Sequence, residues 1–401
     1  IARFTWAFAF AGLLTAASAA QASPTEAGAD PAGTAQRVDP LPDVVDAQVQ
    51  GLDTSEVRAL ISGFSPEVKA HLPEFDLKRI VLHPGEAGFD PAAIGRALLA
   101  YLGREVLADA WLLGQLIVLA VLCAVLKQLG DAFLNAGAAE AAFAVCFLLI
   151  LYLGFQGFRM AVEVGRTTID TMVSFMQAML PLLATMLAAA GAVTTATVFQ
   201  PILLALVNGV ALLISTVFVP LVFLATVLGV VGGFAKGFPI RRLAGFVRGW
   251  SLTFLGLFFT LFMGVLAVRG AIAPIADGVG LRTAKFLTGA FIPVVGGQLS
   301  SALDVVIGGS LLIKNALGVF GLITVFVVTA FPIMKIASML VIFRVGAAVI
   351  EPIADERLVD ALGGFAGGIA LLMAALITVA LMFFIAITVV IAIGNLPAVM
   401  R

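Results

Sequence analysis

Two groups of charged residues interrupt a chain that is otherwise strongly apolar. The first group is Arg159, Glu163, Arg166 and Asp170, whose spacings of four, three and four residues place them on one helical face. Charges that alternate in sign along one face suit two roles. One is a solvated helix at the membrane surface whose charges pair with each other. The other is a contact with another subunit, and the sequence leaves both roles open for this candidate interfacial contact.

The second group lies in the long connection that runs from residue 269 to residue 315. Its candidate residues for a pore or a subunit contact are Asp277, Arg282, Lys285 and Asp304. Beside them, the apolar pieces 286–295 and 305–313 are too short to cross a bilayer and resemble re-entrant segments. Irregular backbone at membrane depth persists only when it is buried in protein or lines a wet cavity. The alternative is ordinary amphipathic packing on the membrane surface.

Residue types that carry out catalysis or bind metals are sparse. Both histidines, His71 and His83, precede the first apolar span, and Cys123 and Cys146 lie inside apolar runs. This pattern weighs against a histidine-dependent protease, a His-ligated metal enzyme in the bilayer, a zinc site and a disulfide framework. The glycine-rich stretch 232–237 lacks the spacing of a P-loop. We therefore expect no enzyme activity, no cofactor and no metal, and any ATP hydrolysis would fall to a partner.

The composition indicates a lipid environment. Hydrophobic residues make up 61% of the chain and the mean hydropathy is +1.13, whereas soluble domains are about 45–50% apolar. The formal net charge is -1, so no basic excess points to nucleic acid as a partner. These features predict an all-α, polytopic helical protein of the lipid bilayer.

A membrane helix needs about 20 apolar residues, and we expect about seven or eight spans. The candidates lie near 107–126, 139–158, 176–193, 201–217, 219–235, 250–268, 316–335 and 369–393. The stretch 201–233 is too long for one span and is divided at Pro220, which predicts a tight hairpin or one span plus a re-entrant piece. Lys335 lies at the end of the expected span 316–335, where its ammonium would reach the interface. Inside a span the same lysine would be costly and would indicate a function. Glycines at four-residue spacing, such as Gly364 and Gly368, favour close helix packing.

The N-terminal part of the chain differs from the rest. Residues 1–22 have the pattern of a signal peptide, with Arg3, an apolar stretch at 4–14 and a small-residue cleavage site at 20–22. An uncleaved anchor helix is the alternative. Residues 23–105 are expected to form an extracytoplasmic linker and a small helical segment, which either docks on a partner or the membrane surface or acts as a mobile spacer. Residues 106–399 are expected to form the membrane domain.

Several separated stretches together resemble the stage III sporulation protein AE family. They are EVGR at 163–166, IDTMVSFMQ at 169–177, LP at 180–181, DGVGLRTAKF at 277–286, FIPVVG at 291–296 and LIKN at 312–315. The similarity runs from about Trp111 to Asn395, while residues 23–110 resemble the family only loosely.

The resemblance implies a non-enzymatic integral membrane subunit of a sporulation channel or secretion-like complex that links mother cell and forespore. It also implies a multi-pass location in the mother-cell membrane facing the forespore. The implied partners are other sporulation stage III membrane and ring proteins and a separate ATPase. It supplies no catalytic residue. The alternative function is a self-contained small-solute permease, which would show inverted repeats and paired interrupted helices; the sequence has no clear internal repeat.

Overall fold

A computed structural model of the chain describes residues 41–75, 77–82, 91–132, 136–232, 240–291 and 296–399. Within these ranges the backbone forms helices and the turns between them, with no strand, so the all-α prediction is confirmed there. The elements are α2 (Leu41–Gln50), α3 (Ser55–Ser62), α4 (Pro66–Lys69), α5 (Leu77–Leu82), α6 (Pro91–Ala108), α7 (Ala110–Ala132), α8 (Ala136–Ala189), α9 (Val193–Leu213), η2 (Ile214–Phe218), α10 (Val219–Val231), α11 (Ile240–Phe291), α12 (Gly296–Ile350) and α13 (Glu356–Val399). The expected signal peptide at 1–22 lies outside the described residues.

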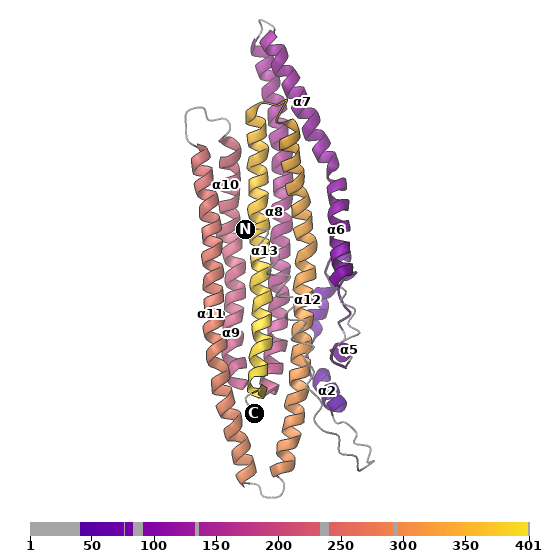
Figure 1. The fold of residues 1–401 in the computed structure, drawn as a ribbon, viewed down its shortest axis with the longest axis vertical. Helices are drawn as coiled ribbons and strands as arrows, with labels where there is room; N and C mark the ends of the chain where they lie inside the picture. Colours follow the sequence, from indigo (N-terminus) through magenta and orange to yellow (C-terminus); the bar gives the residue numbers. More distant parts are fainter. Residues whose placement is uncertain are drawn as a thin grey trace. The chain divides into compact units, whose positions relative to one another are not determined.

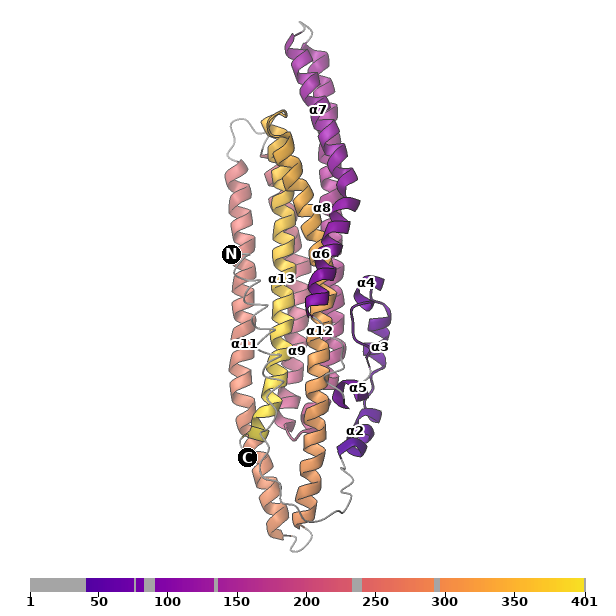
Figure 2. The ribbon, with the colours of Figure 1, turned by 45° about the vertical axis from the view of Figure 1, so that its right-hand side comes forward.

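The long helices α8 to α13 run alongside one another (Figure 1, Figure 2). The chain reverses direction from each long helix to the next, except at η2, where α9 continues into α10. The C-terminal helix α13 contacts α8, α9, α10, α11 and α12. Buried side chains recur along most of its length, for example Leu358, Phe365, Leu376, Phe383 and Ile387. Because α13 is apolar on most of its sides, it packs among the other long helices.

Among the described residues, six helices are long and apolar enough to cross a membrane. The expected number was higher because two pairs of expected spans are single helices. Residues 139–158 and 176–193 fall within or directly after α8, which has 54 residues and continues through Pro181. Such a helix is about 80 Å long, whereas the hydrocarbon core of a bilayer is about 30 Å thick. Helices α8, α11, α12 and α13 therefore exceed the length that a crossing needs.

The second pair of expected spans joins at Pro220 without a hairpin. Helix α9 passes through the π turn η2 into α10 and forms one candidate span from Val193 to Val231. A proline lacks the N–H that would bond to the carbonyl four residues earlier, and its ring presses on that carbonyl. The wider π turn directly before Pro220 makes room for the ring, so the helix continues instead of folding back.

Glycines let α10 and α13 touch through their backbones. A Cβ built on Gly364 would lie 2.9 Å from Val230 N and 3.0 Å from the Gly229 carbonyl carbon. On the next turn, a Cβ at Gly368 would overlap the hydroxyl of Thr226. The expected packing role of the Gly364 and Gly368 spacing is therefore confirmed.

The helical segment α2 to α5 packs on the long helices of its own chain. Gln48 Nε2 donates to Val306 O at 3.2 Å and to Ser310 Oγ at 2.9 Å on α12. The rings of Phe75 and Phe320 have centroids 4.7 Å apart, and Phe64 contacts a phenylalanine of α8. This segment therefore belongs to the same compact unit as the long helices. The expected division between residues 105 and 106 falls inside α6.

Candidate functional site

Asp277 holds together the start of α9 and the middle of α11. The residue is 4% exposed. Oδ1 accepts a hydrogen bond from Thr194 N at 2.9 Å, and Oδ2 accepts from Thr195 N at 2.9 Å and from the Thr195 hydroxyl. The residue before α9 is Ala192, which has no side chain that could cap the helix. Asp277 supplies that cap from 82 residues away and also compensates the positive end of the helix dipole.

Of the other three candidates for a pore or subunit contact, Asp304 is the one whose side chain lies in the described part of the chain. The backbones of Arg282 and Lys285 belong to α11, but their side chains lie outside the described part of the chain. Asp304 is partly buried on α12 and has a partner. The described parts of the expected re-entrant pieces are helical, because residues 286–291 belong to α11 and residues 305–313 belong to α12.

The four residues of the candidate interfacial contact form one exposed row in the middle of α8. Arg159, Glu163, Arg166 and Asp170 are all exposed. In the described part of the chain, none of these side chains forms an ion pair or a hydrogen bond. The opposite side of α8 is buried at Ala161. The four residues share one exposed helical face, as their spacing predicts, and the expected pairing of these charges with each other is absent from the described structure. Their contact with another subunit stays a prediction.

Lys314 is a buried cation that the sequence reasoning did not select as a site. Its side chain is fully buried, and Nζ donates to Ile391 O on α13 at 2.9 Å. The adjacent Asn315 Oδ1 is buried and has no hydrogen-bond partner in the described part of the chain. The available signal was the Lys-Asn pair at the start of a long run without charges, because ionisable residues inside apolar spans are rare and usually functional.

A second polar contact joins the α6–α7 junction to α12. Ser338 Oγ lies 3.3 Å from Asp109 Oδ2 and donates to Lys335 O at 2.7 Å. Asp109 is the single residue between α6 and α7. Lys335 is half-buried, and α12 continues beyond it to Ile350. Lys335 therefore lies in the interior of a helix and not at the end of one.

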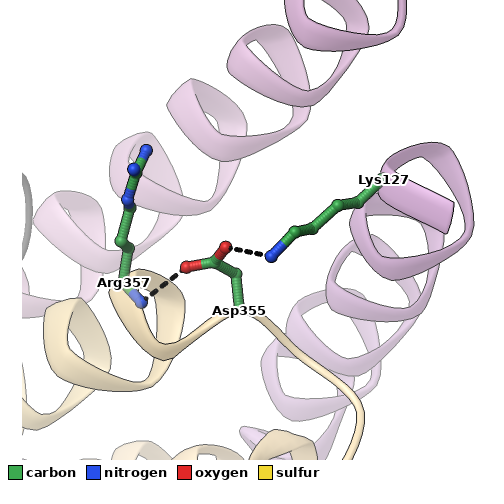
Figure 3. A network of polar contacts seen from close by, with 3 residues as sticks. All are labelled: Lys127, Asp355 and Arg357. Atoms are coloured by element: carbon green, nitrogen blue, oxygen red, sulfur yellow. Dashed lines mark hydrogen bonds and ion pairs between the residues drawn. The ribbon is translucent and has the colours of Figure 1, made fainter. Parts of the chain in front are cut away.

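Asp355 connects α13 to α7 (Figure 3). Its Oδ1 accepts from Arg357 N at 2.9 Å, which caps the start of α13, and its Oδ2 accepts from Lys127 Nζ at 2.7 Å. Partial burial raises the pKa of the Asp355 carboxyl, but the hydrogen bonds from Lys127 and Arg357 outweigh it and lower the pKa below its ordinary value. An aspartate directly before a long apolar helix is the usual sequence signal of such a cap.

The described residues offer contacts between helices and no recognisable catalytic arrangement. No group of three His, Cys, Asp or Glu side chains in the described part could hold a metal ion. Cys123 and Cys146 are buried and free. An open, mainly apolar groove of about 600 Å³ lies along α11 and ends at Arg269. Its lining belongs to a single helix, so it lacks the convergent polar groups that orient a small-molecule ligand.

Comparison with known proteins places the whole chain in one family. The family model described as stage III sporulation protein AE matches residues 75–394. A relative from Bacillus subtilis (strain 168), named stage III sporulation protein AE, is 33% identical over 400 residues and covers 100% of both chains. No solved structure matches the chain. The similarity therefore begins well before Trp111, where the resemblance in the sequence was expected to start.

The family match includes the row on α8, Asp277, Lys314 and Asp355. These residues lie on, or directly before, the long helices that supply the six candidate membrane spans of the described residues. On the evidence of the family model and of the relative that it matches over its full length, the chain belongs to the stage III sporulation protein AE family.

Proposed function

We propose that this protein is a non-enzymatic integral membrane subunit of a sporulation channel or secretion-like complex that links mother cell and forespore. It would lie in the mother-cell membrane facing the forespore. Its partners would be other stage III sporulation membrane and ring proteins and a separate ATPase. The family membership supports the sporulation context.

The observation that carries the subunit role is the charged row on α8. Two basic and two acidic side chains are exposed there without partners in the described part of the chain. The same helix is apolar enough to be a membrane span. Ionised side chains on such a helix are costly in contact with lipid, so they favour a face that meets protein or water. A subunit of a larger assembly provides both.

The test is purification of the tagged, full-length chain from membranes of sporulating cells, with chemical cross-linking before detergent is added. We expect the other stage III membrane proteins and an ATPase to be recovered in fixed proportion to the tagged chain. A membrane protein of similar abundance from the same cells, carrying the same tag, is the control.

The competing permease role makes the opposite prediction. Purified protein that is recovered without these partners, and that carries out solute uptake after reconstitution into vesicles, would overturn the proposal.

A further inference from the structure

The exposed side of α8 carries one continuous row of side chains. Gly157 and Gly165 lie on the opposite side, where a Cβ would meet Phe343 at 2.9 Å and Ile336 at 3.8 Å on α12. The row begins with exposed apolar residues, since Val145 is 58%, Leu148 63% and Tyr152 65% exposed. It continues into the four charged residues of the candidate interfacial contact.

The four charges form two columns on the helix surface. Arg159 and Arg166 are seven residues apart, and so are Glu163 and Asp170. Seven residues make nearly two full turns, so the members of each pair lie almost directly above one another. The two columns are separated by about 40° around the helix, because a step of four residues advances about 400°. A basic column therefore runs beside an acidic column.

This arrangement is complementary to itself under one symmetry. A twofold axis parallel to α8 rotates the face by half a turn, so the basic column of one copy lies opposite the acidic column of the other on both sides of the axis. Flanking charges pair between parallel helices in coiled coils in the same way. Membrane proteins are inserted in one orientation, so two copies in one membrane also meet in the parallel sense that this symmetry needs.

We propose that two copies of this chain associate in parallel through the exposed face of α8 from Val145 to Asp170. Arg159 and Arg166 of one copy face Glu163 and Asp170 of the other. A partner with charges of a single sign would repel two of the four charges in the row. A second copy matches all four charges and adds contact between the apolar residues at the start of the row.

The seven-residue spacing extends to the apolar part of the face. Val145 and Tyr152 precede Arg159 and Arg166 in the same column at intervals of seven. A column that keeps this interval stays turned toward a parallel partner, because two such helices wind gently around each other. The inference does not depend on the channel role, since it requires only a second copy in the same membrane.

The experiment uses full-length chains with two different tags, produced together in a membrane that contains no sporulation proteins. One variant, Arg159→Glu with Arg166→Glu, makes the row acidic. A second variant, Glu163→Lys with Asp170→Lys, makes it basic. Recovery of one tag with the other measures association, and the amount of each chain in the membrane is measured alongside.

We expect wild-type chains to recover each other. Each variant should lose recovery of its own kind by about tenfold or more, because like charges brought together cost several kcal/mol. The acidic variant should recover the basic variant at close to the wild-type level. Glu56→Lys with Glu67→Lys, which reverses two exposed charges on α3 and α4, is the matched control and should recover itself normally.

Three results would overturn the proposal. They are wild-type chains that fail to recover each other, charge-reversed variants that recover their own kind as well as wild type does, and acidic and basic variants that fail to recover each other. If the acidic and basic variants recover each other, both are folded, because a misfolded chain could not associate. The loss of recovery of each variant with its own kind is then an effect of charge.

Discussion

Helices α8 and α12 are nearly equal in length, at 54 and 55 residues, and each carries ionisable residues along an apolar sequence. They treat these residues differently. In α12 the Lys314 ammonium is buried against α13, while the α8 row is exposed. The most apolar window of the α12 span is 67% buried within the chain, and that of the α8 span is 33% buried. This chain therefore uses the Lys314 charge within its own fold and leaves the charges of the α8 row exposed.

The largest effect is expected when the buried charge of Lys314 is reversed. Lys314→Glu would place a carboxylate beside the carbonyl oxygen of Ile391, which requires a donor. We expect a loss of about 3–5 kcal/mol in the free energy of unfolding, as for a buried charge that loses its compensation. The measurement is the thermal unfolding midpoint of the purified protein in detergent.

Lys314→Met serves as the control, because it keeps a long side chain and removes the charge altogether. It should be far less destabilising than the glutamate. Equal unfolding midpoints for the glutamate variant and the wild type would show that the Lys314 site is open to water.

A variant of Asp277 tests whether this buried acid on α11 stabilises the start of α9. Asp277→Ala leaves Thr194 N and Thr195 N at the start of α9 without their acceptor. The expected cost is about 1–3 kcal/mol, the usual penalty for buried donors without partners. Asp277→Asn keeps one acceptor oxygen and should lose less. Hydrogen exchange of the first turn of α9 would locate the effect, and unchanged exchange there would contradict the capping role.

Asp355 tests a contact that is partly open to water. Its folded pKa is below the unfolded value, so its contribution to stability is complete above the unfolded pKa of about 4. The contribution is lost as the pH falls through the lowered folded pKa. Asp355→Asn should therefore reduce stability slightly at pH 7 and remove part of the acid sensitivity between about pH 5 and 2. Unfolding midpoints of both proteins across this range supply the measurement; parallel curves would refute it.

The smallest effect is expected on the exposed side of α8. Glu163→Gln removes one charge that has no partner in the described part of the chain, so stability of a single copy should change by less than about 0.5 kcal/mol. The measurement is the unfolding midpoint in dilute detergent, where copies are separated. A loss comparable to that of the Asp277 variants would mean that the row contributes within the chain, and the contrast with α12 would disappear.

The fold class and the approximate number of spans followed from hydropathy, while the points at which the helices begin and end did not. Proline was read as a boundary at Pro220, yet the π turn before it keeps α9 and α10 continuous. Pro181, Pro201 and Pro332 likewise lie inside helices. Where neighbouring helices hold the backbone in place, the lost hydrogen bond is tolerated. A short stretch of sequence shows that a proline removes a helical hydrogen bond. It does not show the packing of neighbouring helices that offsets this loss.

Among the site residues, local spacing could be predicted from the sequence, while contacts between distant residues could not. The α8 row was found because its spacing is local and repeats with the helix. Asp277 was selected for its charge. Its hydrogen-bond partners, Thr194 and Thr195, were not predicted, because they lie at the start of α9, more than 80 residues earlier in the sequence. Lys314 was overlooked because its acceptor lies 77 residues away on α13. Contacts of this kind depend on which helices become neighbours, and hydrophobic periodicity does not encode that choice.

The cap on α9 also imposes an order on biosynthesis. The first turn of α9 is complete in the chain long before residue 277 leaves the ribosome, because 82 residues separate Thr195 from Asp277. At about 5–20 residues per second, that interval lasts about 4–16 s. During this time the amide groups of Thr194 and Thr195 must rely on water or on other temporary acceptors. The beginning of α9 reaches its final state only after most of α11 has been translated.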